Sequence, residues 1–153
     1  MGSFYITTGR KPSDPTRKLA RWLAAILGGE TENRGHRGLG ELVERAKAKG
    51  LRRVLFIYES HGNPARLVLW EDEWLEPEVW IKSVRFHSAA GGRLAPGFRV
   101  VAEDDFGKRV KGLLELEEPE GEVVELHASV KCLRFEFCGC KVGPELVLRQ
   151  FGV

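Results

Sequence analysis

Apolar positions in the first half of the chain alternate between helical and strand-like spacing. After Asp14-Pro15 an apolar stripe recurs every three or four residues, which predicts an amphipathic helix from Asp14 to about Leu27. Asp14 is expected as its N-cap and Pro15 as its first helical residue. A second stripe predicts a helix over residues 39–49. Short apolar runs predict strands at residues 4–8, 30–33, 54–58 and 66–70.

The second half of the sequence is richer in strand-like segments. Its predicted strands lie near residues 79–86, 98–102, 123–128, 130–137 and 146–151. A helical pattern over residues 104–116 interrupts them, and a glycine-rich loop is expected over residues 87–96. The fold class is therefore α/β (α+β), with helices packed on a mixed sheet.

The two halves of the chain look like distant copies of one unit. Phe4-Tyr5-Ile6-Thr7 precedes a basic helix, and Phe98-Arg99-Val100-Val101 precedes another that carries Lys108. No long linker separates the halves. We therefore predict a single domain over residues 1–153, made of pseudo-repeats over about 1–75 and 76–153.

Composition places the chain among globular proteins, with 42% hydrophobic and 30% charged residues. No apolar run approaches the length of a membrane span, and no secretory leader pattern opens the sequence, so no membrane partner is expected. Its three cysteines are an odd number, which favours a reducing compartment. We expect a cytoplasmic protein.

Charge is divided unevenly along the chain. Residues 1–66 hold 13 Lys and Arg against 6 Asp and Glu, a net charge of +7, whereas residues 67–153 hold 11 against 16, a net charge of −5. Fifteen of the 24 basic residues are arginines, whose guanidinium group binds phosphate and stacks on bases. This division favours a polyanion-binding surface in the first half, and ordinary solvated surface is the alternative.

Candidate metal and catalytic residues form no known signature. Cys132, Cys138 and Cys140 have C-x5-C-x-C spacing, which differs from the close pairs of zinc sites even with His127 nearby. Buried thiols near a strand end are the expected arrangement. No phosphate-binding loop motif is present, and the four histidines are scattered along the chain. We expect no cofactor, no metal and no enzymatic activity.

Cations beside the first predicted helix give the clearest candidate site. Arg10 and Lys11 precede the helix, whose N-terminal N–H groups attract anions. Further cations lie on its polar side and on the glycine-rich loop after it, and these are Arg17, Lys18, Arg21, Arg34 and Arg37. Three aromatic residues either stack on bases or belong to the core, and these are Tyr5, Trp74 and Trp80.

These motifs resemble the Brix-domain family. Ile6-Thr7-Thr8-Gly9-Arg10-Lys11-Pro12-Ser13 followed by Thr16-Arg17 is similar to its opening signature, with Gly9 where the family usually has Ser. Asn33-Arg34-Gly35 resembles its second basic motif. Gly62-Asn63-Pro64, leading into Arg66-Leu67, resembles its hairpin, and Val142-Gly143-Pro144-Glu145-Leu146 resembles its closing strand. The likeness is specific over residues 4–70 and looser beyond.

The resemblance implies a ribosome biogenesis factor of the short archaeal type that binds precursor ribosomal RNA and assists its processing or assembly. It also implies a duplicated fold whose halves resemble the anticodon-binding domain of class IIa synthetases. The expected RNA-binding residues are Arg10, Lys11, Arg17, Lys18, Arg21, Arg34, Arg37 and Arg66. Ribosome assembly proteins are further expected partners. The alternative function is a protein-docking scaffold within a ribonucleoprotein particle. Its candidate contacts are Trp70, Trp74 and Trp80.

Overall fold

The computed structural model describes residues 4–87, 97–116 and 118–150. The glycine-rich loop predicted over residues 87–96 falls almost entirely outside these ranges. In chain order the elements are β1 (Phe4–Thr8), α1 (Asp14–Leu27), β2 (Gly29–Thr31), α2 (Leu39–Ala48), β3 (Arg53–Ser60), β4 (Asn63–Trp70), β5 (Trp74–Phe86), β6 (Phe98–Ala102), α3 (Asp105–Leu114), β7 (Val124–Ala128), β8 (Cys132–Phe137) and β9 (Cys140–Leu148).

The strands form one mixed sheet in the order β2-β1-β3-β4-β5-β9-β8-β7-β6. In the first half β1 pairs parallel with β3, and β4 and β5 follow antiparallel. In the second half β6 pairs parallel with β7, and β8 and β9 follow antiparallel. β5 and β9 join the halves as an antiparallel pair. The predicted mixed α/β fold is confirmed, while the division into two copies near residue 75 stays a prediction.

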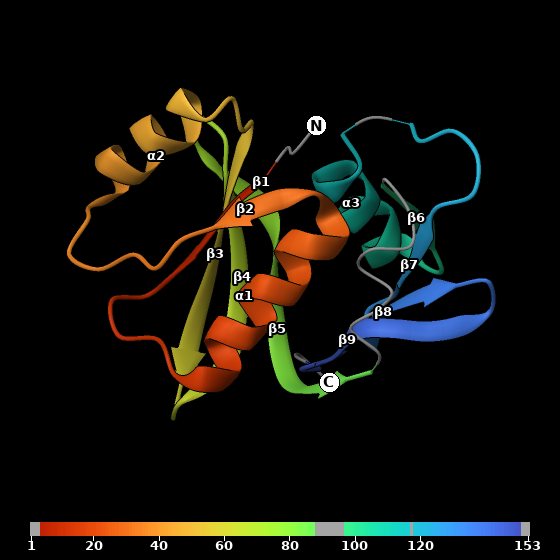
Figure 1. Ribbon diagram of the computed structural model, residues 1–153. Coiled ribbons are helices and arrows are strands. Elements are labelled where there is room, and N and C mark those ends of the chain that lie inside the picture. Colours follow the sequence, from red (N-terminus) through yellow and green to blue (C-terminus); the bar gives the residue numbers. More distant parts are fainter. Residues whose placement is uncertain (1–3, 88–96, 117, 151–153) are drawn as a thin grey trace.

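Helices cover the sheet on opposite faces. Figure 1 shows α1 and α3 beside the middle of the molecule and α2 at the far side of the first half. Side chains of β3 alternate between these layers, because successive residues of a strand point to opposite faces. Leu55 and Ile57 join the core that contains α1 and α3, whereas Val54 and Phe56 join a smaller cluster beneath α2.

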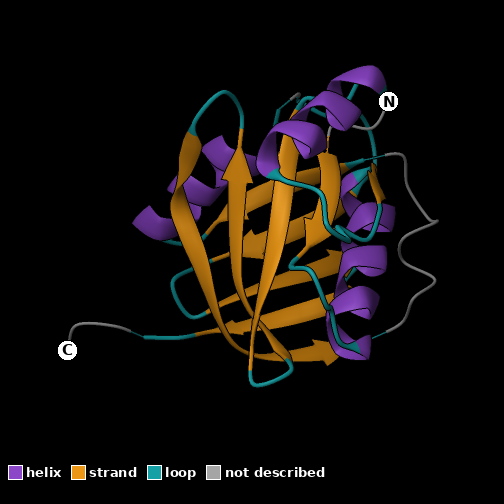
Figure 2. Ribbon diagram, turned by 90° about the vertical axis from the view of Figure 1, so that its left-hand side faces the viewer, coloured by secondary structure: helices purple, strands orange, loops and turns teal. Residues whose placement is uncertain are grey.

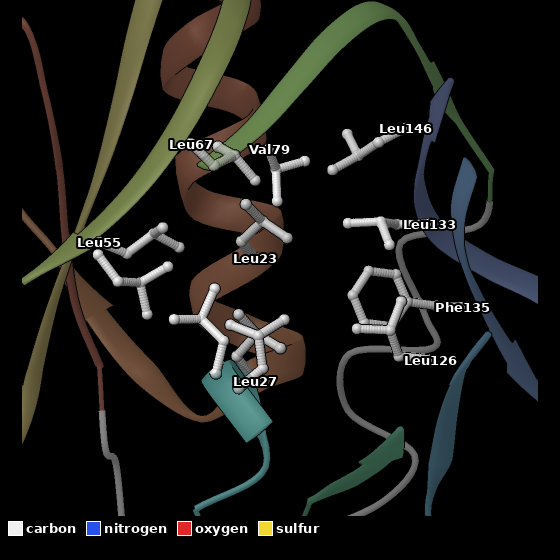
Figure 3. Close-up of a pocket in the computed structure, with 12 residues that line it drawn as sticks. Leu23, Leu27, Leu55, Leu67, Val79, Leu126, Leu133, Phe135 and Leu146 are labelled. Atoms are coloured by element: carbon white, nitrogen blue, oxygen red, sulfur yellow. The ribbon is translucent and has the colours of Figure 1, made fainter. Parts of the chain in front are cut away.

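The main core lies between the two halves of the curled sheet. Figure 2 shows the strands of one half crossing those of the other at a steep angle. In Figure 3, Leu23 of α1 lies between Leu55 of the first half and Leu133 and Phe135 of the second. Only apolar side chains line the small gap among them, a cavity of about 20 Å³. Both halves therefore contribute to one hydrophobic core.

Several boundaries differ from the sequence prediction; β4, for example, begins at Asn63, three residues before the predicted strand. β5 begins at Trp74, five residues before the predicted strand, and pairs with β4 and then with β9. β9 spans Cys140–Leu148, where a strand over 146–151 was expected. Ser13 is the N-cap of α1, so Asp14 lies inside the first turn. Among the described helices, none has the length and apolar content needed to cross a membrane.

Candidate nucleic-acid interface

The loop between β1 and α1 is fastened to the β3–β4 hairpin. The Ser13 backbone N–H donates a hydrogen bond of 2.5 Å to Glu59 Oε1, and the Ser13 hydroxyl donates one of 2.7 Å to the Gly62 carbonyl. Ser13 Oγ also lies 3.2 Å from Thr16 Oγ1. These contacts hold the end of the loop against the sheet and leave Arg10 and Lys11 exposed at its tip.

Glu59 is a supporting residue that the sequence did not identify. Burial acts to raise the pKa of its carboxyl, but hydrogen bonds from Thr16 and Ser13 and the charge of Arg17 outweigh that effect and lower the pKa. Glu59 is thus ionised at neutral pH, which strengthens its bond to the Ser13 N–H. In the sequence, Glu59 is recognisable only as a carboxylate near the end of a predicted strand. Its closeness to the first basic loop follows from the parallel pairing of β3 with β1.

The cations of α1 differ in how far they are engaged. Arg17 Nη1 donates a hydrogen bond of 2.9 Å to the Pro12 carbonyl, and Arg17 also forms an ion pair with Asp14. These contacts hold the loop against the start of the helix. Lys18 Nζ lies 4.2 Å from the ring centroid of Phe86 and 5.2 Å from that of Trp22. Arg21 is exposed farther along the helix.

The second basic loop leaves the same edge of the sheet as the first. β1 and β2 are parallel, and the Thr7 hydroxyl donates to the Glu32 carbonyl at 2.9 Å where the second loop begins. In Figure 1 both loops lie at the left side of the molecule. The structure therefore brings the two loops to one edge, which the sequence alone left open.

Internal hydrogen bonds shape this second loop. Arg34 Nε donates to the Arg37 carbonyl at 2.9 Å, and Arg37 Nη1 donates to the Asn33 carbonyl at 3.1 Å. Gly35 between them has a φ of 59°, which is favourable for glycine. The guanidinium of Arg34 lies 5.7 Å from the ring centroid of Phe56, on the face of the sheet opposite α1.

A partly exposed ion pair supports the start of the loop. Glu32 Oε2 accepts a hydrogen bond of 2.5 Å from Arg45 Nη2, and Lys49 Nζ lies 3.6 Å from Oε1. The hydrogen bond from Arg45 is the main reason that the pKa of Glu32 is lowered. Tyr5, a candidate for base stacking, is wholly buried beside this pair, and burial raises its pKa. Of the two alternatives for Tyr5, the core is therefore the correct one, because β1 is covered on both faces.

Arg66 belongs to a group of aromatic residues on the face opposite α1. Its guanidinium lies 5.0 Å from the ring centroid of Tyr58 and 5.1 Å from that of Trp80, and Glu78 lies 3.6 Å from Nη1. Trp74 is 49% exposed on the same face, with its ring centroid 5.4 Å from that of Phe56. We name Tyr58, Trp74 and Trp80 with Arg34 and Arg66 the aromatic face.

The eight expected RNA-binding residues thus lie in three places. Arg10 and Lys11 lie at the carboxyl edge of the sheet, with Arg37 on the neighbouring loop. Arg17, Lys18 and Arg21 lie on α1, whereas Arg34 and Arg66 lie on the opposite face. The sheet separates the last two groups, so one flat contact surface does not include all eight.

The residues considered for other chemistry lie apart. Cys138 and Cys140 flank the β8–β9 turn and are exposed, and Cys132 is half-buried, so the expectation of buried thiols was wrong. The Glu122 carboxylate, 3.2 Å from Cys138 Sγ, raises the pKa of that thiol. Within the described parts of the chain, no group of three or more His, Cys, Asp or Glu side chains gathers as metal ligands would.

Several carboxylates of the acidic second half pair with arginine or lie beside histidine. On its face opposite the core, Arg134 pairs with Glu103 at 3.1 Å and with Glu136 at 2.9 Å. His127 lies 3.5 Å from Glu125 on the same face, and His87 Nε2 lies 2.8 Å from Glu145 Oε1. These side chains form a ladder of mixed charge across β7, β8 and β9.

Comparison with known proteins gives a consistent result. The chain is 32% identical to a probable Brix domain-containing ribosomal biogenesis protein of Methanothermobacter thermautotrophicus, over 97% of each chain. It is 35% identical over 65 residues to the human U3 small nucleolar ribonucleoprotein protein IMP4, which covers 42% of this chain and 22% of that protein. No protein-family profile matches the chain.

Solved structures share the fold. The crystal structure of a probable ribosomal biogenesis protein from Aeropyrum pernix K1 superposes with a TM-score of 0.78, covering 100% of this chain and 98% of that one. The identity of the two sequences is 22%, so this likeness concerns the fold.

Proposed function

The chain belongs to the family of Brix domain-containing ribosomal biogenesis proteins, and from this premise we propose that it binds ribosomal RNA or its precursor and assists processing or assembly without catalysis. Its place of action is then the cytoplasm, where the expected partners, ribosomal RNA and assembly proteins, meet. The human relative named for the U3 small nucleolar ribonucleoprotein supports an RNA-associated role.

One observation carries this proposal. Two basic loops leave the carboxyl edge of the sheet together, and the first is held so that Arg10 and Lys11 are exposed at its tip. Arg37 lies on the second loop, and the N-terminus of α1 adds backbone N–H groups beside the first. Exposed cations at fixed positions are suited to phosphates, because phosphate contacts supply most of the affinity for nucleic acid.

The test replaces both exposed cations of the first loop with glutamate. We expect Arg10→Glu with Lys11→Glu to weaken binding of structured ribosomal RNA by about tenfold or more, because phosphate contacts are lost. The dependence of affinity on salt concentration should also become weaker, because fewer counterions are released on binding. Filter binding at several salt concentrations measures both effects. The fold is expected to survive, because neither side chain is buried.

A matched control is available on α3. Lys108→Glu with Arg109→Glu makes the same change in net charge on two exposed neighbouring residues. This control should reduce RNA affinity much less than the loop variant. Equal losses in both variants would show that net charge alone decides binding and would refute the loops as the site.

The alternative is a protein-docking scaffold, with Trp70, Trp74 and Trp80 as contacts. Trp80 lies beside Arg66, which also pairs with Glu78, and Trp74 and Arg34 both lie near the ring of Phe56. The nearby guanidinium groups favour RNA over protein as the ligand of the tryptophans. The mixed-charge ladder is then the surface that would bind a protein. Association with other proteins that persists after nuclease treatment would support the scaffold.

A further inference from the structure

The aromatic face lies on a part of the sheet that α2 leaves uncovered. α2 packs over Tyr5 and Val54 through Leu42 and Ala46, near the other end of β3. Beyond it, Tyr58, Arg66 and Trp80 stand opposite one another on β3, β4 and β5, in the register of the sheet. Arg66 therefore lies between two partly exposed rings, with the more exposed Trp74 on the same face.

A cationic hollow continues this face along β5. Lys82 follows Trp80 by two residues, a separation of about 7 Å along a strand. The hollow has a volume of about 610 Å³ and is lined by Lys82, Lys131, Val147, Leu148, Arg149 and Gln150. The Arg149 N–H donates to the Trp80 carbonyl at 3.0 Å, so the hollow adjoins the aromatic face directly. No carboxylate is among the described residues that line it.

We propose that the aromatic face and this hollow together bind single-stranded RNA, with unpaired bases stacked on Trp74, Trp80 and Tyr58 and the backbone phosphates at Lys82 and Lys131. The inference rests on the proposed function, since it assumes that the chain binds RNA. It adds a second contact, on the face opposite α1, that recognises unpaired bases, whereas the basic loops contact phosphates.

The chemistry of the two neighbouring regions selects this ligand. Bases stack on aromatic rings and on arginine planes, and single-strand sites combine such rings with a cationic groove. Arg66 and Arg34 supply guanidinium groups among the rings, and the lysines of the hollow supply charge without competing carboxylates. A duplex keeps its bases stacked inside and offers the rings nothing to stack upon, so it should not use this face.

Two RNA probes separate this contact from the loops. One is an unpaired strand of about ten nucleotides, within the range that single-strand sites cover. The other is a blunt-ended hairpin with few unpaired bases. We expect Trp74→Ala with Trp80→Ala to weaken binding of the single strand by about tenfold or more. Binding of the hairpin should stay within about twofold of the wild type.

Lys82→Glu with Lys131→Glu tests the hollow without touching the rings. Both side chains are exposed, so this variant should fold, and it too should weaken binding of the single strand more than that of the hairpin. Trp22→Ala, on α1, is the control for loss of a partly exposed tryptophan, and Lys108→Glu with Arg109→Glu is the control for charge. Circular dichroism of each variant verifies its fold.

The outcomes distinguish the two proposals. Wild-type protein that binds neither RNA overturns the proposed function and this inference together. Wild-type protein that binds the hairpin but not the single strand, or variants of the face that weaken both RNAs equally, overturn the aromatic face alone. Quenching of tryptophan emission by the single strand that is lost in Trp74→Ala with Trp80→Ala supports stacking directly.

Discussion

At the scale of single residues, the first basic loop is held by Glu59 of the neighbouring strand as well as by side chains of its own. The loop has no regular structure, yet its last residue, Ser13, is held by the carboxylate and by the Gly62 carbonyl. Arg17 contributes from the other side by binding the Pro12 carbonyl. A rigid loop loses little conformational entropy when it binds a phosphate, so these contacts favour affinity without touching the ligand.

Replacement of Glu59 tests this support. Glu59→Gln removes the charge from a hydrogen bond to a backbone N–H, and bonds to charged groups contribute about 1.5–3 kcal/mol. We expect a loss of unfolding free energy of about 1 kcal/mol, because the amide oxygen still accepts a weaker bond. Urea unfolding at pH 7 measures the loss, and an unchanged midpoint would contradict it.

The same variant should alter the dependence of stability on pH. The pKa of Glu59 is lower in the folded protein than its ordinary value, so its contribution is present above that ordinary value and is lost as the pH falls through the folded pKa. The stability difference between wild type and Glu59→Gln should therefore shrink as the pH falls from about 5 to 3. A difference that stays constant over this range would mean that Glu59 contributes through packing.

At the scale of elements, close packing between α3 and the sheet depends on one glycine. A Cβ atom at Gly107 would lie 2.1 Å from the Ala128 carbonyl oxygen and 3.1 Å from the Ala102 Cα, both of which are backbone. α3 thus packs directly against β6 and β7, as its capping by Asp104 also indicates, since that carboxylate accepts from the Gly107 and Val130 N–H groups.

Two glycines of α3 make a matched pair of variants. Gly107→Ala should destabilise the protein by about 2 kcal/mol or more, because the helix must move away from the strands. Gly112→Ala, where a Cβ would meet nothing within 4 Å, should stabilise it by about 0.5–1 kcal/mol through helix propensity. Thermal unfolding compares the two, and a gain in stability at Gly107 would contradict the observed packing.

Elements with a clear apolar period could be predicted from the sequence, and those with breaking residues could not. The helix ending at Leu27 and the strand from Phe98 to Ala102 agree with expectation. The predicted strand began six residues after the observed start of β9, because Gly143-Pro144 is typical of the end of a strand. In the structure Gly143 has a φ of 64°, and the register shift in this part of the β8–β9 pair admits extra residues. The start of β5 was not predicted either, because its first residues include carboxylates and Pro77, which are uncommon within strands.

Candidate site residues were predictable only where local sequence decides their position. Arg10 and Lys11 lie in a loop next to a capped helix, so their exposure follows from the pattern. The aromatic face could not be foreseen, because it depends on which residues of β3, β4 and β5 stand opposite one another. Tyr5 and Trp80 both lie in strands, and only the position of α2 buries one and leaves the other partly exposed.

At the scale of the whole molecule, the two halves share a connectivity but differ in their outer faces. α2 and the aromatic face occupy the outer face of the first half, and the mixed-charge ladder occupies that of the second. The negative charge of residues 67–153 is shared between these surfaces, because Glu71, Asp72, Glu73 and Glu78 lie on β5 or just before it. Lys82 and Lys131 place cations from the same part of the sequence near Trp80.

The shared core predicts that both halves unfold together. Leu133, from the second half, faces Leu23 and the first half across the core (Figure 3). Leu133→Ala should cost about 2–5 kcal/mol, as truncations of buried leucine do. All four tryptophans lie on α1, β4 and β5, so their emission reports on the part of the sheet formed by β1–β5. If the chain is one cooperative domain, this distant truncation lowers the urea midpoint of tryptophan emission as much as that of circular dichroism.

Val130→Ala is the control, because Val130 is 44% exposed near the same strands and should change the free energy of unfolding by less than about 0.5 kcal/mol. An emission midpoint that stays fixed while circular dichroism shifts would mean that the halves unfold separately. That result would contradict a single domain over residues 1–153. It would also weaken the link between the aromatic face and the cationic hollow, because residues of both β5 and β9 line the hollow, which keeps its shape only while that pair is intact.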